Sequence, residues 1–534
     1  MRKSAMKGSR LNQMHPSRVA LRALALAASL LPLAAQTASS QCTASPALSD
    51  AASGPAWNGW GVDLSNSRFQ TASAAQMTAS QVAHLKLKWA FGVPGAKEVY
   101  GEPVVVAGRV FVSADTGVVY SLNADTGCVY WTFQAEAGVR NALSIRSAKP
   151  SAVAYFGDLK ANVYALDATK GTLLWKVHVN EHPTARITGA PKVYEDRIYV
   201  PVASSEEGAS SRADYPCCSF RGSVVALDAA SGKQLWKTWI ITDVPKVVGK
   251  NANGVSRWAP AGGGVWNSPT IDPKRHALYV GTGDAYTTPA AKNTDAIMAL
   301  DLDSGKVLWS VQATENDAWV VGCMSAKPLE NCPKDFGPDQ DFGSPPILRD
   351  LPGGRTLLIA GQKSGNVWAY DPDQRGAVVW RTALTNNTKE FGGKIVWGAA
   401  ADDRNAYFGL EAGAVAAVDI ANGERRWMTP LAAAEGRADH AGHEGPVTAI
   451  PGIVFSGGFD GVLSALSASD GKVVWQFDTV REFQTVNGVA AKGGSIGSAG
   501  PVVAGGTLFV PSGYVGVKRS LPGNVLLAFT SPAE

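Results

Sequence analysis

One short phrase recurs eight times along this chain, and it always contains a tryptophan in its last segment. A full copy joins an Ala-Leu-Asp-like segment, a turn with glycine and a second apolar segment. The eight tryptophans are Trp89, Trp131, Trp175, Trp236, Trp309, Trp380, Trp427 and Trp475. The copy at Trp89 keeps only the last segment, 85–91. A repeat of this size indicates one supersecondary unit stacked on itself.

Each phrase predicts a strand, a tight turn and a second strand. The Asp-x-x-x-Gly or Asp-x-x-Gly element supplies the turn, because Asp bonds to its own backbone and Gly accepts positive φ. Further strand patterns, such as 103–112, occupy the roughly 25 to 50 residues between phrases. About four short strands per repeat are typical of a propeller blade. An indole placed between neighbouring blades would bury about 200 Å² at each joint.

The number of phrases sets the number of blades. Seven phrases carry their own tryptophan strand, and the last strand set, 500–510 and 524–529, has none. The strand at Trp89 can supply it and remove the open sheet edge. The sequence therefore predicts an all-β, eight-bladed propeller with tryptophan docking, closed by an N-terminal strand. Long spacings of 61, 73 and 71 residues mark insertions around 204–221, 243–265 and 313–345, which we expect in loops that build a site.

The first forty residues differ from the rest of the chain. Six basic residues precede an apolar run over 23–35, followed by small residues. This pattern predicts a secretory signal peptide over 1–40 and a propeller domain over 41–534. The apolar run is too short to span a bilayer, and no other segment predicts a membrane span. Without it the chain has 43 basic and 45 acidic residues, which does not favour nucleic acid or an anionic membrane as a partner.

Six cysteines in an exported chain favour disulfide bonds. Cys217 and Cys218 are adjacent, and Cys323 and Cys332 are near enough to close a small loop. The remaining pair, Cys42 and Cys128, could fix the N-terminus to the first blade. Six cysteines allow 15 connectivities, so this pairing is a hypothesis.

The phrases resemble the tryptophan-docking repeats of eight-bladed quinoprotein alcohol dehydrogenases, which use pyrroloquinoline quinone (PQQ). The resemblance covers residues 57–529. Within that family the chain is most similar to the polyvinyl alcohol dehydrogenases, through segments 57–69, 215–223, 487–496 and 522–529.

The resemblance implies a periplasmic, PQQ- and Ca²⁺-dependent enzyme that oxidises secondary alcohols, polyvinyl alcohol among them, to ketones. The chain lacks a Cys-x-x-Cys-His segment for covalent haem. Electrons would therefore pass to a separate cytochrome c. Two alternatives stay open: the same chemistry on another alcohol, and a non-enzymatic propeller that acts as a scaffold in the cell envelope.

A planar quinone needs flat packing and cations for its carboxylates. Trp266 lies between phrases, so it is a candidate stacking platform rather than a blade-docking residue. The resemblance adds Arg140 for a quinone carboxylate, Thr188 and Ser204 as further contacts, and Lys363 for the quinone oxygens. For a single surface Arg or Lys, solubility is the ordinary explanation.

The adjacent cysteines also have a counterpart in the family. In related methanol dehydrogenases a ring formed by two adjacent cysteines covers the second face of the quinone. There the pair belongs to an earlier blade, so Cys217 and Cys218 depart from that order. A purely structural role for them stays open.

The metal and the base would be carboxylates. Glu207, with Glu206 as the second choice, and Asp284 match segments that ligate Ca²⁺, a cation that prefers hard oxygen donors. Asp317 is the carboxylate nearest to the position of the family's base. The alternative interpretations are that Glu206 and Glu207 are a solvated pair, that Asp284 belongs to a turn, and that Asp317 is an ordinary loop residue. Lanthanide-dependent members carry an additional Asp beyond the base; none is evident in this segment, which favours Ca²⁺.

Overall fold

The computed structural model describes residues 41–534 except 49, 53, 386–392, 518 and 533–534. The predicted signal peptide, 1–40, lies outside the described residues. Residues 39–534 form one compact unit. Its described part contains eight antiparallel sheets that follow one another along the chain, which confirms the predicted eight-bladed propeller. Two short hairpins lie outside the blades.

The strands of the first four blades have the following bounds. Blade 1 contains β2 (Val104–Val106), β3 (Arg109–Ser113), β4 (Val118–Asn123) and β5 (Val129–Gln134). Blade 2 contains β6 (Ser144–Arg146), β7 (Val153–Gly157), β8 (Asn162–Asp167) and β9 (Leu173–His178). Blade 3 contains β10 (Ala185–Arg186), β11 (Lys192–Tyr194), β12 (Arg197–Ser204), β13 (Ser223–Asp228) and β14 (Gln234–Trp239). Blade 4 contains β17 (Thr270–Asp272), β18 (Ala277–Gly281), β19 (Ala296–Asp301) and β20 (Val307–Gln312).

The last four blades repeat this arrangement. Blade 5 contains β21 (Ile347–Asp350), β22 (Thr356–Gly361), β23 (Asn366–Asp371) and β24 (Ala377–Ala383). Blade 6 contains β25 (Ala399–Ala401), β26 (Asn405–Leu410), β27 (Ala414–Asp419) and β28 (Arg425–Pro430). Blade 7 contains β29 (Thr448–Ile450), β30 (Ile453–Gly457), β31 (Val462–Ser467) and β32 (Val473–Asp478). Blade 8 contains β35 (Val502–Ala504), β36 (Thr507–Ser512), β37 (Val525–Thr530) and β1 (Lys86–Gly92).

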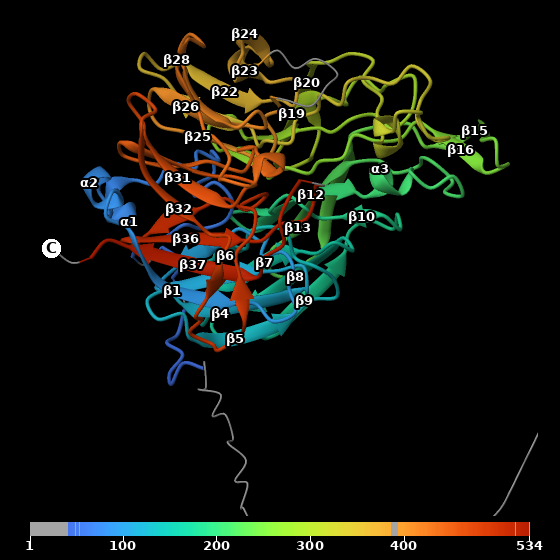
Figure 1. The fold of residues 1–534 in the computed structure, drawn as a ribbon. Helices are drawn as coiled ribbons and strands as arrows, with labels where there is room; N and C mark the ends of the chain where they lie inside the picture. The colour runs from blue at the N-terminus through green and yellow to red at the C-terminus, as the bar shows by residue number, and fades with distance from the viewer. Residues whose placement is uncertain (1–40, 49, 53, 386–392, 518, 533–534) are drawn as a thin grey trace, which may run out of the picture. The chain divides into compact units, whose positions relative to one another are not determined.

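Blade 8 joins the two ends of the propeller. The N-terminal strand β1 pairs antiparallel with the C-terminal strand β37, with Trp89 opposite Ala528 and Gly92 opposite Val525. Figure 1 shows β1 in blue beside β37 in red. The predicted closure by the strand at Trp89 is therefore confirmed: β1 covers the edge of β37 and completes the four-stranded eighth sheet.

The repeated tryptophans connect neighbouring blades. Six indoles donate a hydrogen bond from Nε1 to a backbone carbonyl in the next blade, and these pairs are Trp89–Ala124, Trp131–Ala168, Trp175–Ala229, Trp236–Leu302, Trp380–Ile420 and Trp427–Ala468. The indole also packs on the glycine of the next phrase. At Gly232, for example, an added Cβ would lie 2.7 Å from Cε3 of Trp175. The glycine is thus needed both for its turn and for the joint.

We expect Gly232→Ala to destabilise the propeller by about 2–4 kcal/mol, because the methyl group would add a clash with Trp175 to the strain of positive φ. Gly254→Ala is the matched control: its φ of +77° is similar to the +72° of Gly232, but nothing lies within 4 Å of the added Cβ. It should cost only about 1 kcal/mol. Chemical denaturation of both variants measures the difference, and equal losses would mean that the indole contact contributes nothing.

Isolated β-bridges hold the three predicted insertions beside one another. The first holds α3 (Glu206–Ala209), the second the hairpin β15 (Lys246–Lys250) and β16 (Ser256–Ala259), and the third η1 (Val321–Met324). Isolated β-bridges connect them in series: Arg221 to Gly262, Gly262 to Ala285, and Ala285 to Ala318. Long loops from blades 3, 4 and 5 are therefore held in fixed register beside one another.

Three disulfide bonds are present among the described residues, and they join Cys42 to Cys128, Cys217 to Cys218, and Cys323 to Cys332. The hypothesised pairing is confirmed.

The remaining elements are short. They are α1 (Ala72–Ala75), α2 (Ala79–Val82), η2 (Pro372–Gln374), η3 (Ala438–His440), β33 (Glu482–Phe483) and β34 (Ala491–Lys492). Within the described residues, no helix is long and apolar enough to cross a membrane.

Candidate functional site

A cavity of about 1040 Å³ lies among the inter-strand loops. Its walls come from the connection between blades 1 and 2, from blades 3 to 8 and from the three insertions, with Trp266 and Trp397 among the residues that line it. A smaller cavity of about 30 Å³ shares both tryptophans, together with Arg140 and Thr188. The volume of the large cavity, about 1040 Å³, is at the upper end of the range for small-molecule pockets.

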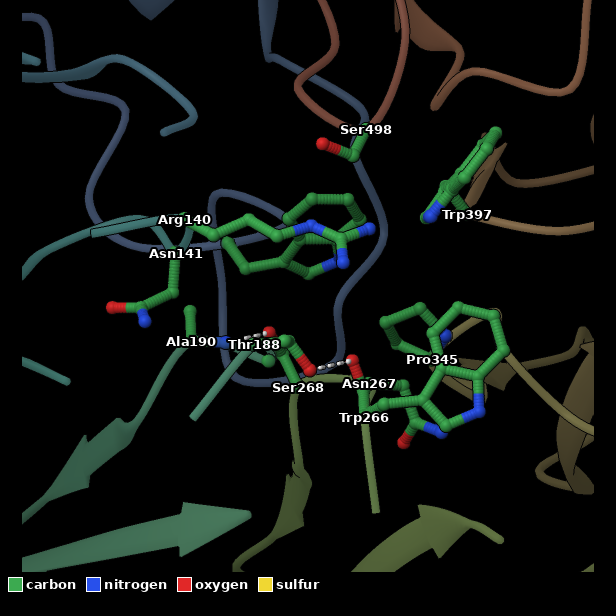
Figure 2. A pocket seen from close by; sticks show the side chains of 13 residues that line it. Arg140, Asn141, Thr188, Ala190, Trp266, Asn267, Ser268, Pro345, Trp397 and Ser498 are labelled. Atoms are coloured by element: carbon green, nitrogen blue, oxygen red, sulfur yellow. Dashed lines mark hydrogen bonds between the residues drawn. The ribbon is translucent and has the colours of Figure 1, made fainter. Parts of the chain in front are cut away.

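Trp266 is held rigidly in this wall. Its Nε1 donates to Oδ2 of Asp341 at 2.8 Å, and its indole packs against Gly343, where a Cβ would collide with the ring. The ammonium of Lys363 lies 5.2 Å from the ring centroid. Figure 2 shows Trp266 beside the small cavity, together with Arg140 and Thr188. The indole thus provides a fixed flat surface at the cavity.

Two carboxylates and two lysines form a buried ion-pair network in the cavity wall. Lys363, which follows β22, places Nζ 2.7 Å from Oδ1 of Asp339 and 2.7 Å from Oδ1 of Asp341. Lys394 binds the other oxygen of Asp339 at 2.6 Å. Asp339 is therefore held between two ammonium groups, whereas Asp341 is shared between Lys363 and Trp266.

Asp284 completes an acidic cluster in the same wall. Carboxylate oxygens of Asp284, Asp339 and Asp341 all lie within 4.8 Å of one another. Oδ1 of Asp284 is buried and has no hydrogen-bond partner among the described residues. The backbone of Asp284 reaches this place because Gly262 allows close approach: a Cβ there would lie 2.6 Å from N of Tyr286.

The structure gives different surroundings to Glu206 and Glu207, the two candidate metal ligands from the sequence. Glu206 is fully buried, and its carboxylate accepts from the backbone N–H groups of Ser219 and Phe220 and from the hydroxyl of Tyr215. Those contacts fold the first insertion. Glu207 lines the cavity instead. Of the two, Glu207, the first choice from the sequence, therefore lies at the cavity, and its role as a metal ligand stays a prediction.

Several carboxyl groups of this wall have shifted pKa values. Burial raises the pKa of Glu207 to about 7; Lys363 and Lys394 oppose this rise, whereas Asp339 and Asp341 add to it. Burial, together with Asp341, Asp339 and Asp295, raises the pKa of Asp284 well above its usual range. Burial also raises the pKa of Asp341. Burial alone would raise the pKa of Asp339 too, but the two lysines outweigh it and hold that pKa low.

Asp317 lies in the wall behind these groups. It is fully buried, and its two oxygens accept from the backbone N–H groups of Asp339 at 3.2 Å and Gln340 at 2.8 Å. Burial raises its pKa to about 6. It is not among the described residues that line the cavity. The structure thus places Asp317 where it fixes the loop that carries Asp339 and Asp341, and its role as base stays a prediction.

The adjacent cysteines are packed in a core cluster. Cys217 and Cys218 share this cluster with Tyr286 and Trp319, which do line the cavity. Backbone hydrogen bonds in both directions tie the pair to Trp258 on β16. Neither cysteine is among the described residues of the cavity wall. A direct contact between this disulfide and a quinone stays a prediction.

The remaining candidates lie at the cavity. Arg140, Thr188 and Ser204 all line it, and Thr188 Oγ1 donates to the backbone carbonyl of Trp266 at 3.4 Å. Arg186 on β10 is a second guanidinium in this wall, and it was not expected from the sequence. The two arginines give the cavity a cationic side next to the Trp266 platform.

Sequence reasoning also missed Asp339, Asp341 and Lys394. The only signal was the pair of acidic residues at 339 and 341 within an insertion already identified. That insertion has no strand periodicity, so its sequence does not show which side chains face the cavity.

The raised pKa values of Glu207 and Asp317 predict that the stability of the protein without added cation depends on pH. Unfolded Glu and Asp ionise near pH 4, while Glu207 and Asp317 in the folded protein ionise at about 7 and about 6. Between these values the folded state binds more protons, so stability should fall as pH rises from about 4 to about 7. Thermal melting across this range should show that fall, and Glu207→Gln should reduce it. Glu424→Gln, at an exposed ion pair, is the control; a cation-free protein that melts at the same temperature throughout would contradict the argument.

The chain has clear relatives among known proteins. A PQQ family model described as glucose/ethanol/alcohol dehydrogenase, beta-propeller domain, matches residues 57–337. A polyvinylalcohol dehydrogenase of Pseudomonas sp. is 41% identical over 89% of this chain and 76% of its own. Another, from Sphingopyxis sp. (strain 113P3), is 37% identical over 92% of this chain and 78% of its own. The fold also matches a solved quinohemoprotein alcohol dehydrogenase of Comamonas testosteroni, with a TM-score of 0.65 and 19% identity over 90% of this chain and 81% of that one.

Proposed function

Because the chain belongs to the family of PQQ-dependent alcohol dehydrogenases with a propeller domain, we infer that it oxidises secondary alcohols to ketones in the periplasm and that polyvinyl alcohol is among its substrates. The single observation that carries this proposal is the fixed Trp266 surface, which lies in one cavity with a buried acidic cluster. The names of the two relatives above support the choice of substrate.

The residues present fit a planar quinone that bears carboxylates. Trp266 offers a flat face, Arg140 and Arg186 offer positive charge, and Thr188 offers a hydroxyl, all on the same cavity. Lys363 lies over the indole and would hydrogen-bond an oxygen of a ring stacked there. We assign these residues to quinone binding.

The acidic wall fits a hard cation, and we assign Ca²⁺ to it. Glu207 and Asp284 are the proposed ligands, because both line the cavity and Asp284 keeps a buried oxygen without a donor among the described residues. When bound, PQQ supplies the acceptor for hydride, and Ca²⁺ supplies the positive charge that polarises the acceptor's carbonyl.

A base must take the proton of the alcohol hydroxyl. Asp317 is the sequence's candidate, and its place behind the cavity wall favours a positioning role instead. Asp341 lines the cavity, holds the edge of Trp266 and has a raised pKa, whereas Asp339 is neutralised by two lysines. We therefore assign the base to Asp341.

We propose that electrons leave to a separate cytochrome c. The alternatives from the sequence make different demands on the protein. Another small alcohol would use the same groups. An envelope scaffold would need neither the buried carboxylates nor the flat surface beside them.

A titration of the purified protein with PQQ and Ca²⁺ tests the proposal. Absorbance should show saturable quinone binding, and an artificial electron acceptor should be reduced when polyvinyl alcohol or a small secondary alcohol is added. Binding without any alcohol-dependent reduction would contradict the enzymatic proposal. A lack of quinone binding with either Ca²⁺ or a lanthanide would leave the scaffold.

A further inference from the structure

The large cavity has a second polar region, away from the acidic cluster. Blades 3 to 5 supply Glu207, Asp284 and Asp341. Blades 6 to 8 supply Glu411, which follows β26, Glu444, which precedes β29, and Arg519, between β36 and β37. The cavity lining thus changes from one charged group to another along its length.

Arg519 organises this second group. Its guanidinium pairs with Glu411 at 2.8 Å and also with Glu444, and its backbone carbonyl contacts Nδ1 of His440. The side chain of Glu411 is 8% exposed and that of Glu444 is 2% exposed. Two carboxylates around one guanidinium, all at a cavity, make a fixed set of charged donors and acceptors.

The hydrogen bonding of this group is incomplete. Oε2 of Glu411, Oε2 of Glu444 and Nε of Arg519 are buried without a hydrogen-bond partner among the described residues, and so is Nε1 of Trp397 beside them. A buried polar atom that lacks a partner costs about 1–3 kcal/mol. Two acceptors next to two donors suit a ligand hydroxyl, which donates one hydrogen bond and accepts another.

An apolar surface adjoins these groups. Trp397 and Tyr514 line the cavity and meet edge to face with ring centroids 5.5 Å apart, and Val517 lies with them. A hydrocarbon chain can pack on such a surface while its hydroxyls reach the carboxylates. The surface therefore suits an aliphatic chain that carries hydroxyls at intervals.

Lys394 links the two polar regions. Its ammonium binds Asp339, and its backbone carbonyl accepts from N–H of Glu411 at 3.0 Å. Both groups also line the same cavity, so a single flexible molecule inside it can contact both.

We propose that Glu411, Glu444 and Arg519 form a second hydroxyl-binding subsite, which holds a remote hydroxyl of the same aliphatic chain whose other hydroxyl is oxidised. The proposal rests on the function inferred above and assigns the substrate class: chains with several hydroxyls are preferred over single alcohols. These three side chains determine specificity and take no part in the proton or hydride transfer.

A matched set of substrates tests the subsite: 2-heptanol, 2,4-heptanediol and 2,6-heptanediol have the same carbon chain. With the PQQ- and Ca²⁺-loaded protein, kcat/KM per oxidisable hydroxyl should be about tenfold higher for at least one diol than for 2-heptanol, as expected for a hydrogen bond to a charged group. Equal values for all three would overturn the proposal, while oxidation of 2-heptanol would still support the inferred function.

Variants then locate the preference. Glu411→Gln and Arg519→Lys should each bring the ratio of diol to 2-heptanol kcat/KM close to one, whereas Glu424→Gln, at an exposed ion pair, should leave it unchanged. A preference that survives both substitutions would place the second hydroxyl elsewhere and overturn the assignment. Thermal melting identifies a variant that fails to fold.

Calorimetry of the unsubstituted, cofactor-free protein gives a measurement independent of turnover and of the variants. It should bind 2,6-heptanediol or 2,4-heptanediol more tightly than 2-heptanol. If no alcohol is oxidised, the inferred function fails, and this comparison still decides the subsite: equal binding overturns it.

Discussion

Asp341→Asn is expected to lower kcat for alcohol oxidation by about a thousandfold, because positioned general bases typically contribute 10²–10⁴. Asn keeps the size of the side chain and can still accept from Trp266 Nε1, so the stacking surface should survive. PQQ binding, followed by absorbance, should therefore change little. The pH profile of kcat should also lose its acidic limb, because that limb reports the ionisation of the base.

Asp317 makes this comparison decisive. If Asp317 is the base, Asp317→Ala abolishes turnover while PQQ stays bound, and Asp341→Asn retains substantial activity. If Asp317 positions the 339–341 loop, as its two backbone hydrogen bonds indicate, its removal weakens both binding and turnover by disturbing that loop. Near-normal kcat in Asp341→Asn would refute the assignment of the base to Asp341.

Asp284→Ala is expected to weaken Ca²⁺ binding by at least about a hundredfold, because even residues that only support a ligand contribute 10- to 100-fold. The change removes a buried oxygen that has no other partner among the described residues. Asp284→Asn keeps an oxygen ligand and should lose much less. Calorimetric titration with Ca²⁺ measures both, and PQQ binding should follow the metal.

The melting temperature of the cation-free variants provides a second check, because it should change in the opposite direction to their Ca²⁺ affinity. In the protein without cation, Asp284 is buried beside Asp341, Asp339 and Asp295, and its raised pKa reports an unfavourable charge. Asp284→Asn should therefore raise the melting temperature of the cation-free protein while it lowers Ca²⁺ affinity. Unchanged affinity in Asp284→Ala would move the metal to other carboxylates.

The propeller could be predicted from the sequence because its repeats are local. Each full phrase contains its own turn glycine and docking tryptophan, and one such unit determines how the next one packs. The closure by β1 was also predictable, since one blade lacked a tryptophan strand and one tryptophan strand lacked a blade. Spacing and export suggested the three disulfides only as one hypothesis among 15 connectivities, and the structure has that pairing.

The site was predictable only where a residue lay near a repeat or matched a family segment. Trp266 and Lys363 flank blade strands, and both lie at the cavity. Asp339, Asp341 and Lys394 are on long connections without periodicity, so only their packing shows that they meet. The sequence could not decide between Glu206 and Glu207 for the same reason. Neighbouring residues in a short helix point in different directions, and only the folded structure shows that Glu206 bonds within its own loop.

The sequence by itself therefore determined the all-β propeller, its eight blades, its closure and the general chemistry of an oxygen-rich, tryptophan-bearing site. The tertiary structure alone decided which carboxylates share the cavity, and it alone brought Glu411, Glu444 and Arg519 together from three blades. The reason is physical. Blade strands obey short-range rules of alternation and turn formation, whereas the cavity is built from loops that are far apart in the chain and are positioned only when the ring closes.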